Sequence, residues 1–234
     1  MSCTEIVTST QTPHGTYRVR LEPDHDAGDP RQDHDQLATL VLRVRGRNCP
    51  LEGDLIAQID QAMERGGFPV AERYLRAEHD VALVLPVWGY EHGALSVGAG
   101  SRTGQYADPW DSGLAGLVYI SAQQVKAEWT DHGVELTNDD LEAVLRAEVA
   151  EYDAWTRGEV YGYVVEHTFD EATQGWREID ACWGHIGYDW ALQAASEALA
   201  GAVQAGAAEH TRRQADAAAD RDEIASLRMA EAGA

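Results

Sequence analysis

The chain has 234 residues, of which 40 are acidic and 18 are basic, so its formal net charge at pH 7 is −22. This charge repels the phosphates of nucleic acids and the headgroups of anionic lipids, which disfavours direct nucleic-acid binding. A chain of this length buries a sizeable core without disulfides, and its cysteines, Cys3, Cys49 and Cys182, lack the spacing of a disulfide framework or a zinc site.

Neither a targeting signal nor a membrane span is predicted. Residues 1–11 lack the basic start and apolar run of a secretory signal, and no stretch approaches the roughly 20 apolar residues of a span. We therefore expect a cytoplasmic protein with reduced thiols and no membrane contact. Lys126 is the only lysine, a bias that fits either a GC-rich genome or adaptation to high salt.

The first predicted elements are two strands separated by a loop. Apolar residues alternate with polar ones at 17–21 and at 40–44, which indicates half-buried strands. The stretch 22–35 between them is rich in proline and carboxylates and is predicted to be an exposed loop without a regular element. Helical spacing of apolar residues then predicts helices over 54–65 and 70–78.

Two buried strands are predicted in the middle of the chain. The apolar runs 81–88 and 114–120 have strand length, and the first is expected to be central. Residues 89–113 are rich in Gly, Ser and Asp and predict a long loop with one ragged strand near Leu95. Ser121, followed by a glutamine three residues later, has the pattern of a capping box that opens a short helix.

The last third of the chain predicts helix, hairpin and helix. The clearest helical signal begins at Asn138 and ends at Gly158. The stretches 160–166 and 176–183 predict a hairpin. After Gly187 an alanine-rich helix is expected, with an apolar stripe formed by Leu192, Ala195, Leu199 and Val203.

These elements together predict an α+β fold, with a mostly antiparallel sheet, packed helices and an alanine-rich C-terminal helix. Hairpin signals are present and a βαβ rhythm is not. We predict one domain over 1–205 and a charged helical tail over 206–234. The sequence has no glycine-rich phosphate loop, and no cofactor is predicted.

A polar turn with the sequence Asp-Pro-Trp-Asp-Ser-Gly at 108–113 leads into the strand predicted at 114–120. As catalytic candidates we select Asp111 as general base or metal ligand, Ser112 as hydroxyl donor, and His92 from the preceding loop. Trp110 and Asp108 are candidate binding residues, Trp110 as a wall for a flat ligand. The alternative is a structural turn in which Asp111 bonds its own backbone and Trp110 fills the core.

Other polar clusters have less specific patterns. The loop 22–35 carries ligand types that metals use, but their spacing matches no named site, so a solvated loop is favoured and no metal is predicted. Arg31 and Asp33 of this loop are candidate binding residues, as is Trp183. We expect Cys182 to be a small buried apolar residue rather than a nucleophile that is paired with His185.

Residues 108–121, Asp-Pro-Trp-Asp-Ser-Gly-Leu-Ala-Gly-Leu-Val-Tyr-Ile-Ser, resemble a family of uncharacterised bacteriophage proteins with a Pro-Trp-Asp-Ser-Gly motif before a strand. Blocks at 29–33, 146–165 and 179–184 are similar in order and spacing, and the resemblance spans about residues 15–187. The chain departs from the family at 90–106 and in its alanine-rich tail. The resemblance implies a phage gene and carries no established activity.

Charge and resemblance together lead to two principal functional hypotheses. The first is a protein of the host cytoplasm that binds a host or defence protein with a basic surface, its carboxylates mimicking nucleic-acid charge. The second is a hydrolase or nucleotide-modifying enzyme with a pocket around Asp111, Ser112 and Trp110. A third hypothesis is an assembly component that oligomerises through its last helix. Its only support is the apolar stripe of that helix, which is too interrupted for a sustained coiled coil. The oligomeric state stays open.

Overall fold

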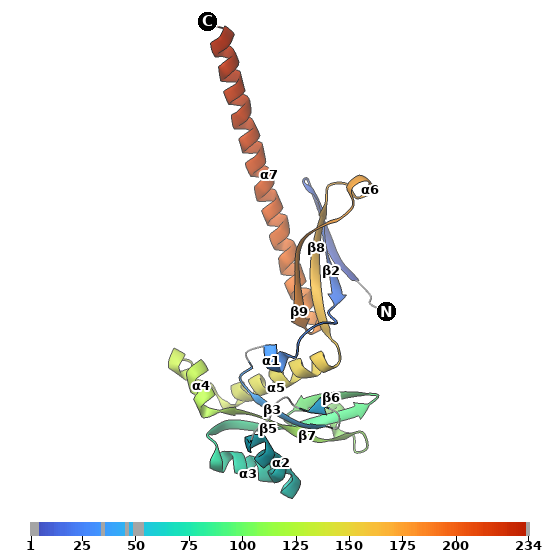
Figure 1. Cartoon of the computed structure of the whole chain (residues 1–234), viewed down its shortest axis with the longest axis vertical. Coiled ribbons are helices and arrows are strands. Elements are labelled where there is room, and N and C mark those ends of the chain that lie inside the picture. The colour runs from blue at the N-terminus through green and yellow to red at the C-terminus, as the bar shows by residue number, and fades with distance from the viewer. Residues whose placement is uncertain (1–4, 34–35, 45–46, 49–53, 233–234) are drawn as a thin grey trace. The chain divides into compact units, whose positions relative to one another are not determined.

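The computed structural model describes residues 5–33, 36–44, 47–48 and 54–232. They form an α+β fold with two antiparallel sheets and a long C-terminal helix, as predicted. The chain divides into two compact units: unit 1 comprises residues 1–27 and 160–234, and unit 2 comprises 28–159 (Figure 1). This division differs from the single domain predicted over 1–205, because each unit has its own sheet and its own apolar core.

Unit 2 is built on a five-stranded sheet. Its strand order is β4-β3-β7-β5-β6, and every pairing is antiparallel. The bounds are β3 Thr39–Val44, β4 Arg47–Asn48, β5 Val81–His92, β6 Ala94–Ala99 and β7 Ser112–Ser121. The strands predicted at 40–44, 81–88 and 114–120 are confirmed. The strand expected near Leu95 is confirmed as β6, but the long loop predicted around it is wrong over its first part, because Gly93 has a φ of 83° and lets β5 turn directly into β6.

Helices cover both faces of this sheet (Figure 1). On one face, α2 Asp54–Gly66 and α3 Phe68–Glu78 bury Ile59, Met63 and Leu75 against the strands. On the other, α5 Asn138–Thr156 buries Leu145 and Val149. Short helices lie at α4 Ala122–Glu128, η1 Gly104–Ala107 and η2 Thr130–His132. All four helices predicted for this part of the chain, including the short helix opened by the Ser121 capping box, are confirmed.

The predicted irregular loop 22–35 contains one element that the sequence analysis did not expect, the short helix α1 Pro30–Asp33. Asp29 Oδ1 accepts the backbone N–H of Arg31 at 2.9 Å, as a helix-capping carboxylate does. Proline at the first helical position loses no hydrogen bond, because that N–H would have no partner within the helix. Proline at this position therefore begins a helix and does not prevent one, which corrects the prediction of a loop without regular elements.

Unit 1 is a four-stranded sheet with one long helix. The strand order is β1-β2-β8-β9, with bounds β1 Glu5–Thr12, β2 Gly15–Pro23, β8 Val160–Thr168 and β9 Arg177–Ile186. The strand predicted at 17–21 and the hairpin of 160–166 with 176–183 are confirmed. Helix α6 Glu171–Gln174 lies in the hairpin connection.

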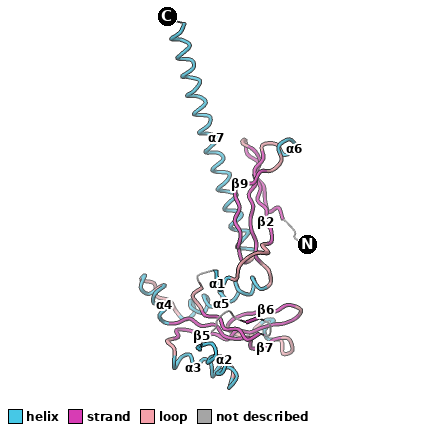
Figure 2. The backbone as a smooth tube through the Cα atoms, in the orientation of Figure 1, coloured by secondary structure: helices cyan, strands magenta, loops and turns pink. Residues whose placement is uncertain are grey.

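The alanine-rich helix α7 Tyr188–Ala232 packs on this sheet with its first part only. Ala191, Ala195 and Leu199 are buried against Val19 and Val165. Residues 211–225 are exposed, and Figure 2 shows the second half of α7 extending beyond the strands. The helix continues without interruption past residue 206, where the tail was predicted to begin. Among the described residues, no helix combines the length and apolar character that crossing a membrane requires.

Candidate functional site

The turn before β7 is organised by Asp108. Its Oδ1 accepts the backbone N–H groups of Trp110 at 2.7 Å and Asp111 at 2.9 Å. These two hydrogen bonds lower the pKa of Asp108 below its ordinary value, and the bond from the Asp111 N–H is the larger cause. An Asx-type turn is therefore present, but Asp108 rather than Asp111 forms it, and Asp111 is left free to point elsewhere.

Asp111 contacts His92, one of the other predicted catalytic residues. His92 Nδ1 lies 3.0 Å from Asp111 Oδ2, with the two side chains 76% and 40% exposed. The pairing arises because the extended β5 carries His92 to the turn, where Glu91 N–H donates to the Asp111 carbonyl at 2.8 Å. A carboxylate that holds one imidazole nitrogen leaves the other available to move a proton. The pair is open to solvent.

Ser112 does not join this pair. Its hydroxyl lies within hydrogen-bond distance of the Asp108 carbonyl and of the Tyr106 carbonyl, the latter at 2.8 Å. Arg102 Nη2 donates to the same hydroxyl at 3.1 Å. The Ser112 hydroxyl therefore hydrogen-bonds to the backbone of the turn and not to His92. Trp110 is 90% exposed, so it does not fill the core.

The candidate binding residues of the early loop lie elsewhere. Arg31 is 6% exposed and contacts Glu148, with Nη1 3.4 Å from Oε2. It also donates to Gln36 and to the Ala38 carbonyl, each at 2.6 Å, and these bonds give it a structural role. The side chain of Asp33 lies outside the described residues, as do His34 and Asp35. Among the described residues, no cluster of three His, Cys, Asp or Glu could hold a metal ion.

Trp183, Cys182 and His185 all lie on β9 in unit 1. Trp183 is 48% exposed and covers Gly162, where a Cβ would stand 2.1 Å from the indole ring. Cys182 is exposed, so its predicted burial is wrong. The cause is that β9 is the edge strand of its sheet and most of its side chains face solvent. Burial lowers the pKa of His185, whose buried Nε2 has no hydrogen-bond partner in the described part of the chain.

Unit 1 also contains a pocket that the sequence analysis missed. Its volume is about 850 Å³, and it is lined by α7 and by the end of the sheet that carries His14, His167 and Arg177. On the α7 side, part of the wall consists of small residues, and longer side chains follow them along the helix; the small ones are Ala198, Gly201, Ala202, Ala205 and Gly206, and the longer ones are Glu209, His210 and Arg213. Because none of the five small side chains is long, the space in front of them stays unfilled. The alanine and glycine run is visible in the sequence, but which strand ends face it is not.

Substitutions at the turn before β7 distinguish the two aspartates. Asp108→Ala is expected to lower the melting temperature by a few degrees, because two backbone N–H groups lose their acceptor. Asp111→Ala is the matched control and should melt like the wild type, since its carboxylate bonds only an exposed histidine. Thermal melting followed by circular dichroism measures both, and equal melting of the two variants would contradict the assignment.

Asp108→Asn gives the pH dependence of the same turn. A carboxylate whose pKa is lowered by folding stabilises the fold above its unfolded pKa of about 3.9 and loses that contribution as the pH falls through the folded value. Asparagine accepts the same two N–H bonds without titrating. The variant should therefore resemble the wild type at neutral pH and lose less stability than the wild type when the pH is lowered below the unfolded pKa and through the folded one, as thermal melting at each pH measures.

Comparison of the chain with protein-family models, with curated proteins and with solved structures finds no match in any of the three.

Proposed function

We propose that the chain is a phage-encoded cytoplasmic protein that binds a host or defence protein, with its carboxylates standing in for the phosphates of a nucleic acid. The net charge of −22 favours a basic partner surface. The resemblance of residues 108–121 to bacteriophage proteins supports a partner from the infected host. The observation that carries the proposal is a set of exposed carboxylates that form no ion pair with any described residue.

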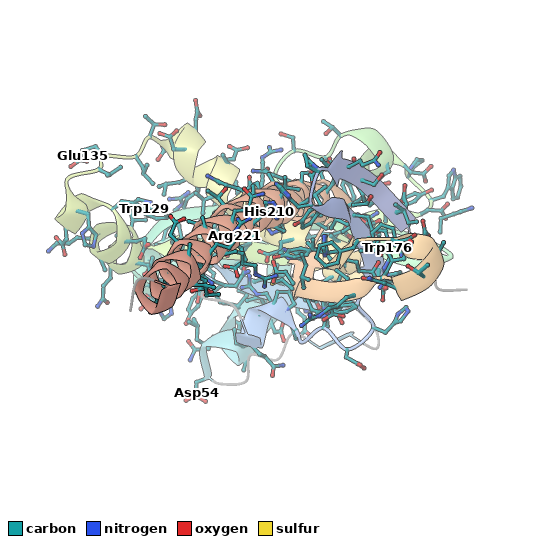
Figure 3. The ribbon with its side chains drawn as sticks, turned by 90° about the horizontal axis from the view of Figure 1, so that it is seen from above. Asp54, Trp129, Glu135, Trp176, His210 and Arg221 are labelled. Atoms are coloured by element: carbon teal, nitrogen blue, oxygen red, sulfur yellow. The ribbon has the colours of Figure 1, made fainter. Side chains whose placement is uncertain are left out.

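Five of these carboxylates lie in residues 128–140 of unit 2, named here the acidic segment. It runs from the end of α4 to the start of α5 and contains Glu128, Asp131, Glu135, Asp139 and Asp140, all exposed. Among the described residues none of the five forms an ion pair, and Figure 3 shows Glu135 on the outer side of the connection. Hydrogen bonding to the Thr137 side chain lowers the pKa of Asp140, which keeps this carboxyl ionised. Unpaired charges of one sign attract an oppositely charged surface over a Debye length.

Salt dependence is the test of this proposal. The immobilised full chain is exposed to a host lysate at about 50 mM and about 500 mM NaCl, which shortens the Debye length roughly threefold. We expect a basic protein to be captured at low salt and released at high salt, and double-stranded DNA not to be retained. Capture that is indifferent to salt, or retention of DNA, would overturn the proposal.

Charge-reversal variants locate the surface. The double variant Asp131→Lys and Glu135→Lys should weaken capture at least tenfold, because it places cations against a basic partner. The control is Glu78→Lys with Asp80→Lys, which changes the net charge by the same amount at two exposed positions outside the acidic segment. Equal losses in both variants would mean that net charge, and not this segment, directs binding.

A hydrolase or nucleotide-modifying enzyme is the second candidate, and the contact of His92 with Asp111 is the observation that favours it. The pair could act as a general base, but Ser112 is held by the turn and is not positioned as a nucleophile. Asp111→Ala separates the two functions. An enzyme would lose activity and keep its fold, whereas a binding protein would still capture its partner.

A further inference from the structure

The pocket of unit 1 has a preformed aromatic wall. The rings of His14 and His210 stack with centroids 3.8 Å apart, and Figure 3 labels His210 on α7. The His167 ring lies 4.4 Å from that of Tyr17 and 4.6 Å from that of Phe169. His167 Nε2 is 3.0 Å from the His14 carbonyl, and because a carbonyl only accepts, His167 is the donor and its ring is fixed. Such a wall suits the stacking of a flat ring.

The charged residues of the lining leave one cation without a partner. Glu209 lies 2.6 Å from Arg212 and 2.8 Å from Arg213, and Asp180 accepts a hydrogen bond from a tyrosine of β8. Among the described residues Arg177 forms no ion pair, although acidic residues outnumber basic ones by more than two to one. A free guanidinium at the edge of a pocket can bind a carboxylate or a phosphate through two parallel hydrogen bonds.

Two lining residues also have polar atoms without partners. His14 Nδ1 and Thr168 Oγ1 are buried, and neither has a hydrogen bond to any residue that the structure describes. Buried polar atoms are satisfied in most native proteins, and exceptions often indicate a place where a further group is bound. The volume of about 850 Å³ lies within the range of roughly 300–1,000 Å³ that small-molecule pockets occupy.

We propose that this pocket binds a small molecule that combines a flat ring with one acidic group, the chemistry shared by nucleoside monophosphates and aromatic carboxylates. The ring lies against the histidine wall, and the acidic group pairs with Arg177. The site is independent of the acidic segment, because its lining belongs entirely to unit 1.

Calorimetric titration of the full chain tests the ligand class. AMP and 1-naphthoate carry both features, adenosine and 1-naphthalenemethanol carry the ring alone, and ribose 5-phosphate carries the acid alone. At least one of the two complete probes should bind about tenfold more tightly than its partial counterparts. Tighter binding of AMP identifies a phosphate ligand, and tighter binding of 1-naphthoate a carboxylate. If neither complete probe binds at concentrations up to about 5 mM, the proposal is wrong.

Variants on α7 and β9 locate the bound probe. Ala205→Trp fills the pocket and should weaken binding at least about tenfold. Ala207→Trp is the control, because this exposed residue lies two positions further along the same helix and does not line the pocket. Arg177→Gln should weaken the complete probe about tenfold and leave the ring-only probe unchanged. Wild-type binding in Ala205→Trp with a native circular dichroism spectrum would overturn the proposal; should that variant fail to fold, wild-type binding in Arg177→Gln would do so.

Discussion

Replacing Glu148 by alanine is expected to lower the free energy of unfolding of unit 2 by about 3–5 kcal/mol, the usual loss when a buried ion pair is left with one partner. Glu148 is 12% exposed and Arg31 is 6% exposed. The carboxylate also accepts the backbone N–H groups of Leu37 at 2.9 Å and Ala38 at 3.0 Å, which joins the segment before β3 to α5. Alanine leaves a buried guanidinium and two N–H groups without this acceptor. Urea denaturation measures the loss.

A matched substitution on the same helix separates this effect from a general loss of charge. Glu142 forms an exposed i,i+4 pair with Arg146, and Glu142→Ala should cost less than about 0.5 kcal/mol. Both variants remove one carboxylate from α5, so their difference reports burial and the hydrogen bonds to the backbone. Similar losses in the two variants would show that Glu148 does not organise the segment before β3.

The elements that could be predicted are those whose signal is local. The strand at 17–21 alternates because one face packs on α7, and the helix from Asn138 has an apolar face and a capping box within its first turn. Each of these patterns lies within about ten consecutive residues, so it can be recognised without knowing which other part of the chain packs against it. The α+β class follows from their sum.

One strand was missed because it has little apolar pattern of its own. β1 has the sequence Glu-Ile-Val-Thr-Ser-Thr-Gln-Thr, with mostly exposed side chains, and it exists because β2, the next strand along the chain, supplies its hydrogen bonds. The strand expected near Leu95 is β6, which Gly93 joins directly to β5. The division into two units, by contrast, depends on partners distant in the sequence. β8 pairs with β2 although the two strands are more than 130 residues apart in the sequence. The residues of unit 2 therefore lie, along the chain, between the two segments that form unit 1.

The candidate site was predictable only in part for the same reason. The turn at 108–113 was evident from its composition, but the identity of the capping carboxylate depends on backbone geometry that the sequence does not state. The structure brings His92 to Asp111 by extending β5, and it engages Arg31 with Glu148, 117 residues later in the chain. The pocket of unit 1 could not be predicted, because it forms only where α7 packs beside the ends of three separate strands.

The second large effect is expected at Gly116 in β7, the central strand of unit 2. Gly116→Ala should lower the free energy of unfolding by at least about 3 kcal/mol, more than ordinary overpacking. A Cβ there would lie 2.0 Å from the Val41 carbonyl oxygen and 3.1 Å from the Leu42 Cα. These are backbone atoms of β3, so the clash is relieved only by separating β3 from β7. Gly116 is also paired with Val87 of β5, which prevents β7 from moving away in the other direction.

Gly113→Ala is the control within the same strand, because nothing lies within 4 Å of the Cβ that it would add. Its effect should stay below about 1 kcal/mol in either direction. The two variants add the same methyl group three residues apart, so a difference between their melting temperatures measures the close approach of β3 and β7. If both melt like the wild type, β3 and β7 are further apart at Gly116 than the distance to Val41 implies. If both are destabilised alike, the cause is the loss of glycine from β7 and not the clash.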